Sequence, residues 1–169
     1  MGTSVRTFVG IDPAFRESGM GICVLSENES GLVAEFHRIK TTISAIRFLD
    51  SFCTLSMYEK TYFAVENSNL QSTTFAKYVA GNNPAQLMRI SRNVGANQAV
   101  SQLIVDLLHE RNMDVLEVSP ERKGKKWTKE QAEQVAKKYG ISLPRTSQDD
   151  RDAFKLAIIL YEKKIKEKA

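Results

Sequence analysis

The chain has 169 residues, 42% of them hydrophobic and 26% charged, with a formal net charge of +4. These values are ordinary for a soluble globular protein, so we expect one domain over residues 1–169. No apolar run approaches a membrane span, and residues 1–6 carry no secretory core, so we expect neither a membrane-spanning nor a secreted protein. Cys23 and Cys53 have no metal-ligand spacing, so we expect two buried free thiols in a reducing compartment.

The first part of the chain is predicted to form four strands, with one helix between the third and the fourth. The predicted strands are residues 7–12, 19–26, 32–40 and 61–65, with hairpin turn chemistry at 28–31 and helical periodicity over 43–57. The first and fourth of these strands end on carboxylates, Asp12 and Glu66. Because a buried charge must be paired or ligated, both positions are candidates for binding a cation.

A long helix is predicted after Asn83-Pro84, over residues 85–111. Its expected buried side consists of seven apolar residues: Leu87, Ile90, Val94, Leu103, Ile104, Leu107 and Leu108. This apolar surface is wider than one sheet face would cover, so the helix is a candidate dimer interface. Burial between two other helices of the same chain is the alternative. Residues 114–118 form the fifth predicted strand.

Two capping-box patterns open the last helices, at Thr128 and at Ser147. The resulting element order, βββαβαβαα, predicts an α/β fold with a mixed five-stranded sheet and helices on both faces. In such a sheet the strands that end at Asp12 and Glu66 can be parallel neighbours, about 4.8 Å apart. Their two carboxylates could then share metal ions.

The last helix contributes two more carboxylates. Asp149 and Asp152 follow the same helical spacing as Ala153, Leu156 and Leu160, so all five fall on one face. Acidic side chains at the top of an apolar face suggest a site for divalent cations. The alternative for Asp149 is that it only caps the helix and favours its dipole.

Residues 121–129 hold five basic residues around a glycine, in a connection where backbone can approach a ligand. The candidates for phosphate binding are Arg122, Lys123, Lys125, Lys126 and Lys129. Trp127 either stacks on a ligand or anchors the loop, or it is a hydrophobic staple before Thr128. His37 and His109 belong to no motif, and we expect His109 to face solvent.

With these residues in place, the chain resembles the RuvC-type Holliday-junction resolvases of the RNase H-like superfamily. Gly10-Ile-Asp-Pro13 followed by Ser18-Gly19-Met-Gly21 is similar to that family's first strand and turn, and Val65-Glu66 to its second acidic position. Gly95-Ala-Asn-Gln98 is similar to its central helix, and Asp149-Asp-Arg-Asp152-Ala153 to its closing pattern. The similarity covers nearly the whole chain, in the same order.

The resemblance implies an RNase H-like endonuclease that binds four-way DNA junctions as a homodimer and nicks two opposed strands symmetrically. It implies Mg²⁺ or Mn²⁺, two ions per site, with Asp12, Glu66, Asp149 and Asp152 as the metal ligands. Two metals would supply an activated water and relief of charge on the leaving 3′ oxygen. Lys123 and Lys129 fall near family positions that touch DNA. The implied location is the cytoplasm of a bacterial or phage-infected cell.

The sequence also departs from the family pattern and leaves alternatives open. Asn67-Ser-Asn-Leu70 stands where the family has an aromatic residue, so Phe75 or Tyr78 is a candidate base-stacking wedge or a residue packed on the core. Other functions considered are an RNase H-like nuclease for flaps, hybrids or general branched DNA, and a non-catalytic junction-binding protein. A phosphate-binding ATPase of the actin or sugar-kinase type would need about twice this length and no Asp149/Asp152 pair.

Overall fold

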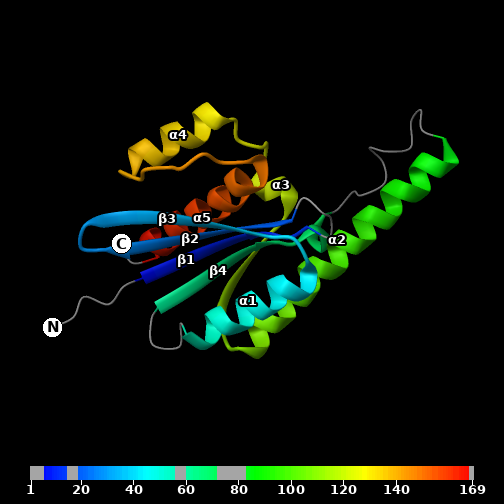
Figure 1. The fold of residues 1–169 in the computed structure, drawn as a ribbon, viewed down its shortest axis with the longest axis horizontal. Coiled ribbons are helices and arrows are strands. Elements are labelled where there is room, and N and C mark those ends of the chain that lie inside the picture. The colour runs from blue at the N-terminus through cyan, green and yellow to red at the C-terminus, as the bar shows by residue number, and fades with distance from the viewer. Residues whose placement is uncertain (1–5, 15–18, 56–59, 72–82, 168–169) are drawn as a thin grey trace.

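The computed structural model describes residues 6–14, 19–55, 60–71 and 83–167. The strands are β1 (Arg6–Asp12), β2 (Met20–Asn28), β3 (Gly31–Ile39), β4 (Lys60–Glu66) and β5 (Asp114–Val118). The helices are α1 (Thr42–Leu55), α2 (Pro84–Glu110), α3 (Pro120–Lys123), α4 (Lys129–Lys138) and α5 (Gln148–Lys166), with a 3₁₀ turn η2 at Ser68–Leu70 (Figure 1).

The five strands form one mixed sheet in the order β3-β2-β1-β4-β5. The meander of β1, β2 and β3 is antiparallel, whereas β4 and β5 run parallel to β1 and to each other. The hairpin turns at Gly31, which has a φ of 122°, and the Asn28 side chain accepts a hydrogen bond from the Ser30 amide. The predicted mixed five-stranded sheet is confirmed.

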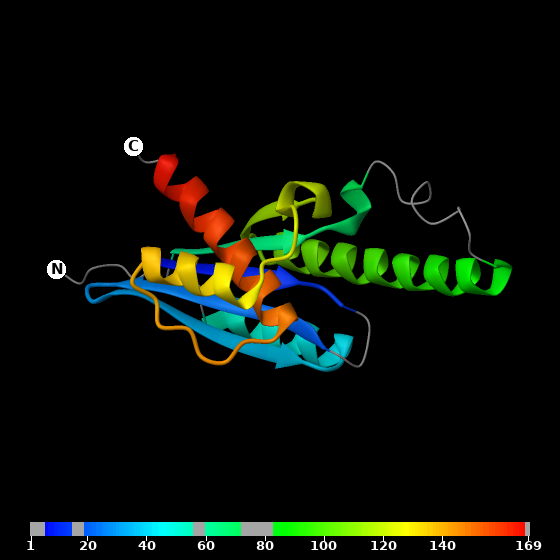
Figure 2. The ribbon, with the colours of Figure 1, turned by 90° about the horizontal axis from the view of Figure 1, so that it is seen from above.

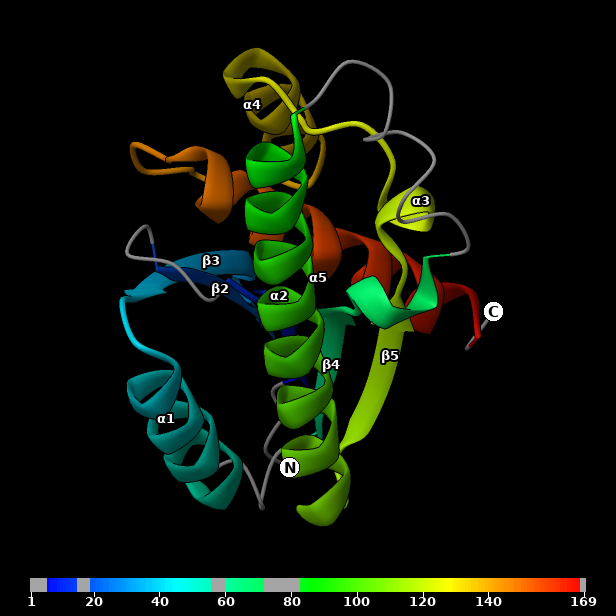
Figure 3. The ribbon, with the colours of Figure 1, turned by 90° about the vertical axis from the view of Figure 1, so that its right-hand side faces the viewer.

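Helices cover both faces of the sheet, as predicted (Figure 3). The strands alternate their side chains between the two faces: Phe8 of β1 packs with α4 and α5, whereas Val9 packs with α1 and α2. Each face therefore has its own apolar core. The strands at the centre of the sheet are covered on both sides, which explains why β1 is a nearly continuous apolar run.

Helix α2 extends well beyond the end of the sheet (Figures 1 and 2). Its buried residues all lie in its second half: Val100, Ser101, Ile104, Val105 and Leu108. The expected buried side was therefore wrong at Leu103, which is 46% exposed. Leu87, Ile90 and Val94 are only half-buried because they lie on the part of the helix that projects past the strands.

The helix boundaries follow the capping signals closely. Asn83, Thr128 and Ser147 each form a capping box at the start of α2, α4 and α5. The short helix α3 was not predicted, although Ser119 caps it and Pro120 stands in its first turn. Over the described residues, no helix combines the length and the apolar composition that crossing a bilayer requires.

Candidate active site

Asp12 and Glu66 lie side by side at the same edge of the sheet. Strands β1 and β4 are parallel and their last paired residues are Ile11 and Val65, so the two acids follow at equivalent positions. Both carboxylate side chains are largely covered, with 17% of each exposed. The neighbouring strand ends expected from the sequence therefore bring these two acids together.

Asp152 reaches the same point from α5 and is almost fully buried, at 1% exposure. The helix can approach because β1 has Gly10 beneath it: a Cβ at this position would lie 2.1 Å from the Ala153 carbonyl oxygen. Gln148 donates a hydrogen bond to Asp152 Oδ1 over 3.1 Å and orients the carboxylate. Gly10 thus sets the distance between β1 and α5, the helix that carries Asp152.

The three carboxylates converge on the ammonium group of Lys123, which ends α3. Its Nζ lies 3.4 Å from Asp12 Oδ1 and 3.9 Å from Asp152 Oδ2, and it forms an ion pair with Glu66 Oε2. Only 6% of the Lys123 side chain is exposed. A second lysine, Lys126, approaches Asp152 Oδ2 to 3.6 Å from the solvent side.

The electrostatics of the cluster are those of a concentrated, buried negative charge. Burial raises the pKa of Asp12 to about 7; the Lys123 ammonium opposes this shift, and the carboxylates of Glu66 and Asp152 add to it. Burial lowers the pKa of Lys123, but the attraction of the three carboxylates outweighs burial and raises it overall. One ammonium among three carboxylates leaves an excess of negative charge.

Asp149 does not join this cluster. Its Oδ2 pairs with Arg38 Nη2 of β3 at 3.0 Å, and 28% of its side chain is exposed. The first turn of α5 rests on β2 here: a Cβ at Gly21 would lie 2.5 Å from the Asp149 carbonyl oxygen. Asp149 and Asp152 thus have different partners, because Arg38 of β3 lies beside one residue and Lys123, among the other two acids, lies beside the other.

The donor set fits a hard divalent cation in its chemistry. Carboxylate oxygens are the ligands that Mg²⁺ and Mn²⁺ prefer, and three of them already surround one positive charge. Within the part of the chain that the structure describes, no three His, Cys, Asp or Glu side chains are spaced as a metal site. The distances of 3.4 and 3.9 Å from Lys123 Nζ to the oxygens of Asp12 and Asp152 suit an ammonium group. Mg²⁺ takes its oxygen ligands at about 2.0–2.1 Å, so these oxygens are spaced more widely than around a bound Mg²⁺.

The basic loop of residues 124–128 is held against α5 by hydrogen bonds and by ring contacts. Lys155, which is buried, donates a hydrogen bond to the Lys125 carbonyl over 2.7 Å, and Arg151 donates one to the Trp127 carbonyl over 3.2 Å. The Trp127 ring packs edge-on against Phe154. Trp127 therefore anchors the loop. The side chains of Lys125 and Lys126 are exposed, and that of Lys126 lies beside Asp152.

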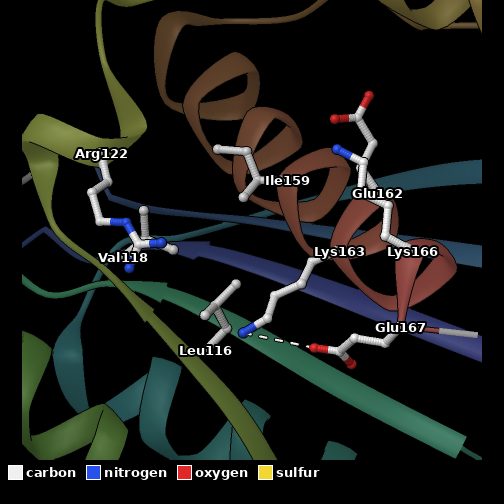
Figure 4. Close-up of a pocket in the computed structure, with 8 residues that line it drawn as sticks. All are labelled: Leu116, Val118, Arg122, Ile159, Glu162, Lys163, Lys166 and Glu167. Atoms are coloured by element: carbon white, nitrogen blue, oxygen red, sulfur yellow. Dashed lines mark ion pairs between the residues drawn. The ribbon is translucent and has the colours of Figure 1, made fainter.

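Arg122 is exposed on α3, two residues before this loop. Its side chain lines a pocket of about 540 Å³ between β5, α3 and α5, with Leu116, Val118 and Ile159 among its apolar walls (Figure 4). Lys129, at the start of α4, is 64% exposed and pairs with Glu133 at 3.7 Å. The five basic candidates thus occupy several environments: Lys123 in the acidic cluster, Lys125 and Lys126 on the loop, Lys129 on α4 and Arg122 in the pocket.

Two cysteines and one histidine singled out in the sequence lie outside this site. Cys23 and Cys53 are free and buried, and His109 is exposed, as predicted. Phe75 and Tyr78 lie outside the described residues. The sequence did not reveal Asn67, which is 1% exposed and donates a hydrogen bond to Glu117 over 2.6 Å, fixing the chain just after Glu66. An amide side chain directly after a strand-end acid was the available signal in the sequence.

Comparisons with protein-family models and with curated proteins found no match. Among solved structures, the fold is similar to that of T. thermophilus RuvC in complex with Holliday junction substrate, with a TM-score of 0.52 and 16% sequence identity. The alignment covers 96% of this chain and 96% of that chain. A likeness at this identity shows a shared fold, and the protein therefore has the RuvC-like, RNase H-like α/β fold that its sequence indicated.

Proposed function

We propose that this protein is a metal-dependent endonuclease that resolves four-way DNA junctions by paired symmetric nicks. The observation that carries the proposal is the convergence of Asp12, Glu66 and Asp152 on one cation position. These acids come from two strand ends and one helix, yet they meet around a single ammonium group. The shared fold with a RuvC that was solved with a Holliday junction supports the choice of substrate.

Asp12, Glu66 and Asp152 would hold Mg²⁺ or Mn²⁺, and Asp149 would contribute to a second ion once it leaves Arg38. Two bound ions would supply an activated water and would offset the charge on the leaving 3′ oxygen. The side chains of Lys125 and Lys126 would contact phosphates beside the acids. A homodimer is part of the proposal because symmetric nicks need two active sites on one junction.

The test uses purified protein with Mg²⁺ or Mn²⁺ and end-labelled four-way, three-way, flap and linear DNA. We expect paired nicks in the four-way junction. Asp12→Asn and Asp152→Asn should keep junction binding while cleavage falls at least about 100-fold, because several kcal/mol of transition-state stabilisation are lost at about 1.4 kcal/mol per tenfold. Asp106→Asn, an exposed acid on α2 that bonds to Gln102, is the matched control.

Two of the alternative functions have their own outcome in the same assay. Equal cutting of flaps would indicate a more general branched-DNA nuclease. Junction binding with no cutting in either metal would indicate a non-catalytic junction-binding protein. Undiminished cleavage by Asp12→Asn and Asp152→Asn would remove the proposed active site altogether.

A further inference from the structure

Lys123 occupies the position at which the acidic cluster binds positive charge. Its Nζ contacts a carboxylate from each of β1, β4 and α5, and its side chain is 6% exposed. A lysine that binds a DNA phosphate would instead extend its ammonium toward solvent, as Lys126 does at 69% exposure. The ammonium of Lys123 is therefore committed to the acids in this structure.

The backbone directs Lys123 to this position. Asn67, just after Glu66, donates its amide hydrogen bond to the Val118 carbonyl, which holds the end of β5 beside that acid. Ser119 then caps α3, and Gly124 ends it with a φ of 72°, a left-handed conformation that favours glycine. Lys123 thus stands on a single helical turn directly above the acids.

An ammonium and a divalent cation cannot share this position. Both need the oxygens of Asp12, Glu66 and Asp152, and two positive centres this close repel strongly in a largely buried site. The lysine side chain has a flexible four-carbon stem, so the ammonium can leave without a change in the sheet. Occupancy by Lys123 and occupancy by a metal are alternatives at one site.

We propose that Lys123 is a built-in counter-cation that neutralises the acidic cluster and is displaced when a divalent metal binds. The inference rests on the proposed function, because it assumes that the cluster is a metal site. It adds a specific role for Lys123: the lysine sets the metal affinity of the DNA-free protein by competing for the same three carboxylates. Metal binding and release of the Lys123 side chain are then one event.

The first test measures Mn²⁺ binding to DNA-free protein by calorimetry. Lys123→Met keeps the length of the side chain and removes the competitor, so the Mn²⁺ affinity should rise, by about 5- to 150-fold if the coupling is of ordinary size. Lys126→Met is the matched control: it removes the same charge at a similar distance from Asp152, but from an exposed position. Its effect should stay below about threefold, since exposed pairs are weak.

The second test needs no variant. Wild-type protein is treated with an amine-acetylating reagent, with and without saturating Mn²⁺, and each lysine is followed by mass spectrometry. Labelling of Lys123 should rise at least severalfold with Mn²⁺, because its ammonium leaves the acids. Lys164, which pairs with Asp114 at 2.7 Å and is 18% exposed, is the internal control and should not change.

The outcomes separate this inference from the proposed function. Mn²⁺ binding that Lys123→Met strengthens no more than Lys126→Met, or Lys123 labelling that Mn²⁺ leaves unchanged, would overturn the displacement and leave the nuclease proposal intact. Absence of Mn²⁺ binding in every protein would overturn both. If Lys123→Met does not fold, the labelling of wild-type protein decides.

Discussion

The position of Asp152 depends on Gly10, a residue without a side chain. Gly10 lets the backbone of α5 lie directly on β1, where a Cβ would come within 2.6 Å of the Ala157 nitrogen. Asp152 stands one residue before Ala153, whose carbonyl oxygen covers the same glycine. The separation of β1 and α5 at Gly10 therefore sets the distance from Asp152 to Asp12.

Gly10→Ala should destabilise the protein by about 1–3 kcal/mol, because the added methyl meets helix backbone that cannot rotate away. Gly95→Ala is the control, since nothing lies within 4 Å of a Cβ there and alanine favours a helix by about 0.5–1 kcal/mol. Urea unfolding of both variants measures the difference. A Gly10→Ala protein as stable as the wild type would show that α5 does not rest on β1 as described.

At the scale of elements, the basic residues of segment 121–129 lie on different elements and have different surroundings. Lys125 and Lys126 are carried by a loop that Lys155, Arg151 and Trp127 hold against α5. Arg122 belongs to the wall of a pocket beside β5 (Figure 4). Charge that is continuous in the sequence is thus distributed over separate surfaces in the fold.

This division predicts different salt dependences of junction binding. Lys125→Gln and Lys126→Gln should each reduce the steepness of log K against log salt by about 0.9, the value for one phosphate contact. Arg122 is also exposed, but its side chain lines the pocket beside β5 and not the loop, so Arg122→Gln should leave the slope unchanged. Fluorescence anisotropy at several salt concentrations measures the slopes. A reduced slope for Arg122→Gln would mean that DNA also reaches the pocket.

At the scale of the whole molecule, α2 gives the protein an arm outside its core (Figure 2). The face that is buried at Ile104 and Leu108 continues along the projecting half through Leu87, Ile90 and Val94. This apolar stripe extends beyond the end of the sheet, and it is the feature that favours the proposed homodimer. Two copies would then place two acidic clusters on one assembly.

Val94→Glu should weaken self-association at least about tenfold, because an unpaired charge buried at an interface costs more than about 1.4 kcal/mol. Ala99→Glu introduces the same charge on an exposed side of the same helix and should leave the oligomeric state unchanged. Sedimentation velocity at several concentrations compares both with the wild type. A wild-type protein that stays monomeric at all concentrations would contradict the dimer.

The sequence by itself determined the elements and the acids that end them. Periodicity and capping residues such as Asn83 and Thr128 act over a few positions, so they placed the helices of the described residues to within a residue or two, α3 excepted. Asp12 and Glu66 were recognisable because a charge at the end of an apolar run is unusual at any strand. These properties are local, and local properties can be derived from neighbouring residues.

Only the tertiary structure decided which groups face each other. Asp149 pairs with Arg38, which is 111 residues away, and Lys123 and Asp12 are separated by the same distance in sequence. Neither pairing has a sequence signal, because both depend on the register of the sheet and on the height at which α5 crosses it. The sequence pattern marked four acids, and the structure places three of them around Lys123. This grouping arises only when the strands and α5 pack together.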